Sequence, residues 1–121
     1  MSREQTQYAN RRTSISRKAA YSKAAQKRLH NARVKLVGVN AKIRSATVAG
    51  QIVINRQLEA AQRAVDANLV AAESSLERLR KSSDEVWEDL TPDVDTAWED
   101  LSQSIKKLVA GYSECKRPSG T

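Results

Sequence analysis

The stretch IRSATVAGQIVI, residues 43–54, decides whether this chain folds back on itself. Upstream of it, apolar residues recur every seven positions, with a second apolar residue three positions further on, which is the heptad pattern of a helix with one apolar seam. Ile43 and Ile54 are 11 residues apart, a heptad plus four, so the stripe changes register across Gly50. Residues 48–52 lack the Asn, Asp or Pro of a common turn. Two folds stay open: a reversal that packs two helices antiparallel, or a stutter within one continuous helix.

The rest of the chain predicts an all-α fold with polar ends. Residues 1–15 lack periodic apolar positions and are expected to form a flexible basic arm, and residues 113–121 a disordered tail. Between them we expect a single helical or coiled-coil unit over residues 16–112, with a possible turn near 49–51. The fold class is therefore an elongated helical hairpin or a long coiled-coil-like helix, followed by a C-terminal amphipathic helix.

A second boundary is predicted at residues 91–92. Thr91, Pro92 and Asp93 stand in the order typical of a helix start, with an N-cap, a proline at the first helical position and an acid in the first turn. Proline inside a helix removes a backbone hydrogen bond. We therefore expect one helix to end before Thr91 and the last helix to run from Pro92 to about Ala110.

Charge is distributed unevenly along the chain. The 121 residues include 21 Lys+Arg and 14 Asp+Glu, for a net charge of +7, and no Phe. Residues 1–60 hold 13 Lys+Arg and two acids, whereas residues 61–121 hold 8 Lys+Arg and 12 acids. Such a polar chain either offers a basic arm to anionic partners or brings two oppositely charged segments together. The length excludes a large multi-domain enzyme, and so few aromatics predict a thin core.

Few residues are suited to chemistry. His30 and Cys115 are each the only residue of their type, so no metal site of several His or Cys ligands is available, and we expect His30 to be solvated. The glycines are too far apart for a phosphate-binding loop. We expect no catalytic residues, no cofactor and no enzyme activity. No apolar run is long enough to cross a membrane, and a single cysteine fits a reducing, cytoplasmic location.

An internal repeat of 11 residues is the most specific motif. The units are SLERL at residues 75–79, VWEDL at 86–90 and AWEDL at 97–101. Eleven residues make almost three helical turns, so Leu76, Trp87 and Trp98 are predicted to lie on one line, beside an acidic line. Two interpretations stay open: the tryptophans form the bulky part of the core, or they form a face that docks onto a partner or a lipid interface.

At these repeats the chain resembles small bacterial coiled-coil proteins with apolipoprotein-like 11-residue repeats, some of them described as stress-response proteins. The resemblance covers roughly residues 39–112 and rests on the two Trp-Glu-Asp-Leu units and the spacer 91–97 between them. It implies an elongated, non-enzymatic helical protein linked to stress tolerance, with no catalytic residue to transfer. The chain departs from the pattern in its strongly basic first 45 residues and in having Pro92 in the spacer.

The function that these patterns favour is assembly. An apolar stripe this long and thin is expected to need a second chain to cover it, so we predict self-association or a protein partner. The predicted interface consists of Leu29, Leu36, Ile43, Leu58, Val65, Leu76, Leu79, Trp87, Leu90, Trp98 and Leu101.

Nucleic-acid binding is the alternative function. No acid occurs between Gln5 and Leu58, so cations along the first helix can follow a phosphate backbone without reading sequence. An anionic membrane surface is a second alternative for the same cations. They could also face the acidic run 84–100, which has eight carboxylates and no Lys or Arg. The candidate anion-binding residues are Arg17, Lys18, Lys23, Lys27, Arg28, Arg33, Lys35, Lys42 and Arg44.

Overall fold

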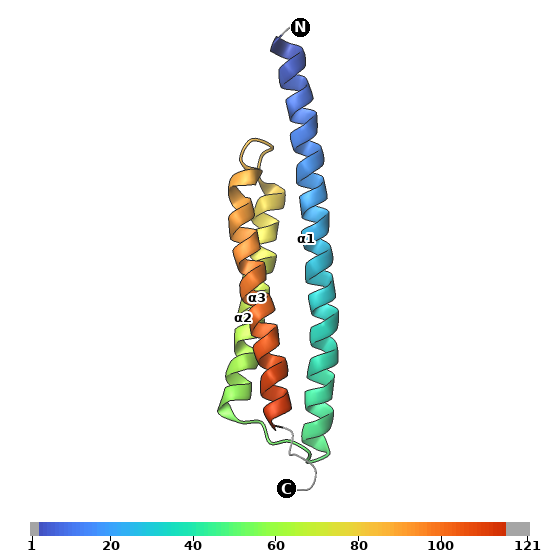
Figure 1. The fold of residues 1–121 in the computed structure, drawn as a ribbon, viewed down its shortest axis with the longest axis vertical. Coiled ribbons are helices and arrows are strands. Elements are labelled where there is room, and N and C mark those ends of the chain that lie inside the picture. The colour runs from blue at the N-terminus through green and yellow to red at the C-terminus, as the bar shows by residue number, and fades with distance from the viewer. Residues whose placement is uncertain (1–2, 116–121) are drawn as a thin grey trace.

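Three helices, each antiparallel to the next along the chain, are present in the computed structural model, which describes the backbone of residues 3–115 and the side chains of residues 15–115. The helices are α1 (Arg3–Val48), α2 (Arg56–Lys81) and α3 (Trp87–Cys115), and no strand occurs among the described residues. Figure 1 shows α1 running down, α2 returning and α3 running down again. The predicted all-α fold is confirmed: α1 and α2 form the helical hairpin, and α3 is the C-terminal helix that follows it.

The chain reverses at Gly50, which answers the question left open by the sequence. Gly50 has a φ of 73°, in the left-handed region that glycine adopts without a Cβ clash. The N–H of Gly50 donates to the Thr47 carbonyl at 3.1 Å, and the N–H of Gln51 donates to the Ala46 carbonyl at 2.8 Å. This pair of bonds is the Schellman motif that ends helices at a glycine. The turn chemistry is therefore a helix C-cap, so the absence of Asn, Asp and Pro was not evidence against a turn.

Helix α2 is capped at both ends by residues that the sequence analysis did not single out. The Asn55 side chain accepts a hydrogen bond from the Leu58 N–H at 2.8 Å and so satisfies a free donor in the first turn. At the other end, the N–H of Ser82 donates to the Leu79 carbonyl. Arg78, Arg80 and Lys81 lie in the last turn, where positive charge complements the helix dipole.

The second boundary lies at residues 82–86, so the break predicted at 91–92 is wrong. Helix α3 begins at Trp87 and contains Pro92. Pro92 has no N–H to give the Glu88 carbonyl, and the Thr91 hydroxyl donates to that carbonyl at 2.8 Å. The Ser83 carbonyl accepts from the N–H groups of Val86 and Trp87 at the start of the helix. Glu88 and Asp89 lie in the first turn of α3 and complement this terminus, whereas the sequence analysis gave that role to Asp93.

The helical ends reach further than expected. Helix α1 begins at Arg3, within the segment predicted as a flexible arm, and neither Pro nor Gly occurs between Arg3 and Val37 to interrupt it. Helix α3 runs to Cys115, past the predicted end near Ala110, while residues 116–121 lie outside the described residues. With 46 residues against 26 and 29, α1 extends beyond the loop that joins α2 to α3 (Figure 1).

A single apolar core runs along the three helices. The α2–α3 pair packs most closely, and Gly111 of α3 lies against Leu58 of α2, where an added Cβ would be in ordinary contact with a Leu58 methyl carbon at 3.6 Å. Helix α1 adds a heptad seam of alternating small and large residues. The most deeply buried large side chains, Leu58, Leu79, Leu101 and Leu108, all come from α2 and α3. The buried residues of the α1 seam are Ala25, Leu29, Ala32, Leu36, Ile43 and Ala46.

Candidate functional site

The residues predicted for an intermolecular interface lie in the core of one chain. Nine of the eleven are buried, and Leu90 and Trp98 are half-buried against the same core. The apolar stripes of the three helices cover one another, so the premise that the stripe needs a second chain is wrong. Self-association through these side chains would require the bundle to open.

The 11-residue line is also interrupted. Because the helix ends at Lys81, Leu76 lies on α2 while Trp87 and Trp98 lie on α3. Trp87 is 4% exposed, and its ring lies 6.1 Å from that of Tyr21, centroid to centroid. The tryptophans therefore belong to the core, in agreement with the first of the two interpretations.

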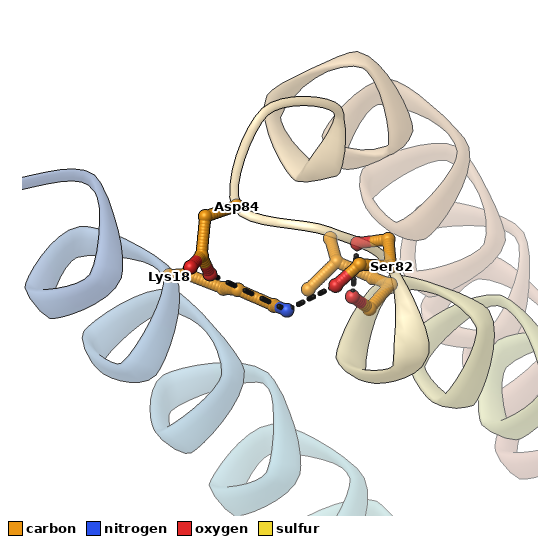
Figure 2. A network of polar contacts seen from close by, with 4 residues as sticks. Lys18, Ser82 and Asp84 are labelled. Atoms are coloured by element: carbon orange, nitrogen blue, oxygen red, sulfur yellow. Dashed lines mark hydrogen bonds and ion pairs between the residues drawn. The ribbon is translucent and has the colours of Figure 1, made fainter. Parts of the chain in front are cut away.

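The basic helix meets the acidic run at one end of the bundle. Figure 2 shows the Lys18 side chain reaching from α1 to the loop between α2 and α3, where its Nζ donates to the Ser82 carbonyl and lies 4.0 Å from an Asp84 carboxylate oxygen. Arg17 forms an ion pair with Glu88 at 3.5 Å, with both side chains more than half exposed. Exposed pairs of this kind contribute little stability, so they orient the end of the bundle more than they hold it.

Tyr21 makes a part-buried polar contact between α1 and α3. Its hydroxyl donates to Asp95 Oδ1 and lies 3.2 Å from the Thr91 carbonyl oxygen. Burial of the phenol raises the pKa of Tyr21, and the hydrogen bond to Asp95 and the charge of that carboxylate raise it further, against a smaller opposite effect of Arg28. Tyr21 was not among the predicted site residues. Its hydrogen bonds join α1 to α3.

Most of the predicted anion-binding cations form no ion pair with a described carboxylate. Arg33 binds Glu73 of α2, with Nη2 at 2.9 Å and Nε at 3.1 Å from the same oxygen. Within the part of the chain whose side chains are described, no carboxylate lies within ion-pair distance of the other six. These six are exposed: Lys23, Lys27, Arg28, Lys35, Lys42 and Arg44.

Two of these free cations line a groove between α1 and α2. The groove has a volume of about 980 Å³, with Leu29 and Leu76 among its apolar lining. Only two carboxylates, Glu73 and Glu77, enter it, and no residue of α3 contributes. We define the basic groove by the Lys, Arg and His residues that line it: Lys23, Lys27, His30, Arg33, Arg78, Arg80 and Lys81.

The α2 side of the basic groove was missed by the sequence analysis. Arg78, Arg80 and Lys81 fall in the half of the chain that is acidic overall, and that average conceals them. The signal was local: three cations in four residues at a helix C-terminus. His30 is exposed, as expected, and lies on the rim formed by α1.

Neither a metal site nor a membrane-spanning helix is found among the described residues. Among the described residues, no three His, Cys, Asp or Glu side chains are grouped so that they could hold a metal ion. None of the described helices is long and apolar enough to span a membrane. No protein family, no curated protein and no solved structure matches this chain. The resemblance to proteins with apolipoprotein-like repeats therefore stays a prediction.

Proposed function

We propose that this protein is a non-enzymatic, cytoplasmic helical protein that binds the phosphate backbone of nucleic acid in the basic groove, without reading sequence. The observation that supports the proposal is the composition of the groove, where six Lys and Arg side chains face only two carboxylates. Assembly through the predicted apolar interface is less favoured, because those residues already pack in the core of the chain.

The pairing within the groove leaves cations on both walls. Glu73 is bound by Arg33, and Glu77 forms ion pairs with Arg80 and Lys81. Lys23 and Lys27 on α1 and Arg78 on α2 have no such partner among the described side chains. Two walls with unpaired cations concentrate positive potential in the groove more than a single helix face does. A polyanion would gain its binding free energy there by releasing counterions.

The dimensions and chemistry of the groove fit a backbone more than a base. The α1 wall runs from Lys23 to Arg33, which is about 15 Å along the helix, and one strand of B-DNA spaces its phosphates roughly 3.4 Å along the axis, so about four phosphates fit. No aromatic residue lines the groove. Base stacking is therefore absent from the proposed mode of binding, and sequence preference is expected to be small.

The test is titration of a short duplex of random sequence with the purified protein at several salt concentrations. We expect binding that weakens steeply with salt, with a slope of log K against log salt between about −2 and −4. Absence of binding at 50 mM salt would overturn the proposal. A parallel arm replaces the duplex by vesicles with anionic headgroups, and co-sedimentation with vesicles but not DNA would assign the groove to a membrane surface.

A matched pair of variants locates the binding. The triple variant Lys23→Glu, Lys27→Glu, Arg78→Glu reverses the unpaired groove cations and is expected to weaken DNA binding by at least tenfold. The control Arg63→Glu, Lys106→Glu, Lys107→Glu changes net charge equally at exposed positions outside the groove. Equal losses in both variants would mean that DNA responds to net charge alone, and the groove would have no specific role.

A further inference from the structure

The outward face of α1 is basic in its middle part and uncharged toward its C-terminal end. Lys23, Lys27 and His30 make it basic where it borders the groove, but no charged residue lies on the line that follows. That line advances in steps of four and three residues, so it forms one continuous stripe opposite the core seam. We call it the valine stripe, and it consists of Val34, Val37, Gly38, Ala41, Ser45 and Val48.

The valine stripe is open to solvent in the single chain. Val34, Val37 and Val48 are 59%, 70% and 84% exposed. A Cβ added at Gly38 would meet nothing within 4 Å. Small residues flanked by valines allow a second helix to approach closely, and contiguous exposed apolar residues are typical of contact surfaces.

The charges beside the stripe indicate what can cover it. Lys35 and Lys42 border it on the side of α3, Arg44 borders it on the side of α2, and all three are exposed without an ion pair among the described side chains. Two copies of the stripe packed antiparallel would bring Lys35 of one chain near Lys42 of the other, which is repulsive. An uncharged stripe between cations is complementary to an uncharged stripe between carboxylates.

The outward face of α3 has that pattern. Pro92, Thr96 and Gln103 are exposed, uncharged and spaced by four and seven residues, so they lie on one line. Asp89 and Glu99 border this line and are exposed, without an ion pair among the described side chains. The face from Asp89 to Gln103 and the valine stripe from Val34 to Val48 are each about 21 Å long, since both span 14 helical steps.

We propose that the valine stripe of α1 binds the acidic outward face of α3 of a second copy of this chain. The contact joins two different surfaces, so in a pair one copy keeps its acidic face free and the other keeps its valine stripe free, and assembly continues as a ring or an open chain. The residues of the contact are separate from those of the basic groove. The inference therefore stands or fails independently of nucleic-acid binding, although assembled copies would bind a long polyanion through several grooves at once.

Two half-blocked variants test the contact. Lys35→Glu with Lys42→Glu disables the valine stripe and leaves the acidic face intact, while Asp89→Lys with Glu99→Lys does the reverse. The mass in solution, measured by light scattering at low salt, is expected to exceed one chain for the wild-type protein and to fall with salt. Each variant alone is expected to be monomeric. An equimolar mixture is expected to regain assembly, because the intact stripe meets the intact acidic face at one contact and the two charge-reversed surfaces attract each other at the other.

Further variants separate docking from folding. Gly38→Leu fills open space in the single chain, so its helical circular dichroism and melting temperature should not fall, whereas assembly should be lost. Arg56→Glu with Arg63→Glu on α2 carries the same charge change as the stripe variant, lies outside both proposed surfaces and should assemble as the wild type does. A wild-type protein that is monomeric at low salt and high concentration would overturn the proposal. So would half-blocked variants that assemble alone, or a mixture that stays monomeric while the wild type assembles.

Discussion

The hydroxyl of Thr91 donates a hydrogen bond to the carbonyl oxygen of Glu88, 2.8 Å away, inside α3 where Pro92 cannot supply the backbone donor. In a regular helix that carbonyl would accept from the N–H of residue 92, which is a proline here. The threonine side chain thus replaces a backbone bond, and the helix continues through Pro92.

Thr91→Val is expected to lower the free energy of unfolding by about 0.5–1.5 kcal/mol, because it removes this hydrogen bond while the shape of the side chain stays nearly the same. In a Pro92→Ala background the same change should cost less, since the N–H of residue 92 then satisfies Glu88. Denaturant unfolding of the four proteins of this cycle measures the coupling. Equal costs of Thr91→Val in both backgrounds would show that the hydroxyl does not compensate for the proline.

Tyr21→Phe is expected to change how stability responds to alkaline pH. The folded state raises the pKa of Tyr21 through burial and Asp95, so the folded chain holds the phenolic proton more tightly than the unfolded chain does. That stability is fully present below the ordinary tyrosine pKa of about 10 and is lost as pH rises above it. The wild type should therefore lose stability more steeply than Tyr21→Phe above pH 10, measured by urea unfolding. Equal slopes for the two proteins above pH 10 would show that the fold does not hold the Tyr21 proton more tightly.

Glycine-to-alanine substitutions should have opposite effects at two positions. Gly50→Ala places a Cβ on a residue with a φ of 73° and is expected to destabilise the fold by about 1–2 kcal/mol. Gly38→Ala lies inside α1 with open space around it and is expected to stabilise by about 0.5–1 kcal/mol through helix propensity. Thermal melts of both variants provide the comparison. A Gly50→Ala protein as stable as the wild type would mean that the chain reverses in another way.

Core truncation should distinguish the interior from the surface. Leu79 is fully buried, and Leu79→Ala is expected to cost about 2–5 kcal/mol because it removes apolar contacts and leaves a cavity. Val70→Ala, on the same helix but 63% exposed, should change stability by less than about 0.5 kcal/mol. The loss at Leu79 should not depend on protein concentration, because its contacts lie within one chain. A loss of stability that depends on protein concentration would show that Leu79 lies in an intermolecular interface.

The sequence by itself determined which residues would be buried. The heptad steps from Leu29 to Ile43 and the 3- and 4-residue steps along α2 follow from helical geometry, and that geometry is local. The N-terminal cations could likewise be located from spacing alone. What these patterns did not reveal was their partners, since a stripe has the same sequence whether it meets its own chain or another.

The tertiary structure decided the reversal at Gly50, the continuation through Pro92 and the assembly of the basic groove. Each depends on groups that local propensity does not weigh: a left-handed glycine with two capping bonds, a threonine hydroxyl that replaces a missing donor, and the antiparallel return of α2, which brings Arg78 opposite Lys23 and Lys27. Once α1 turned back, the apolar stripe was covered from within. The surface available for function therefore consists of the cations and valines that lie outside the three-helix core. They stay exposed because only the side chains on the inner helix faces pack against one another.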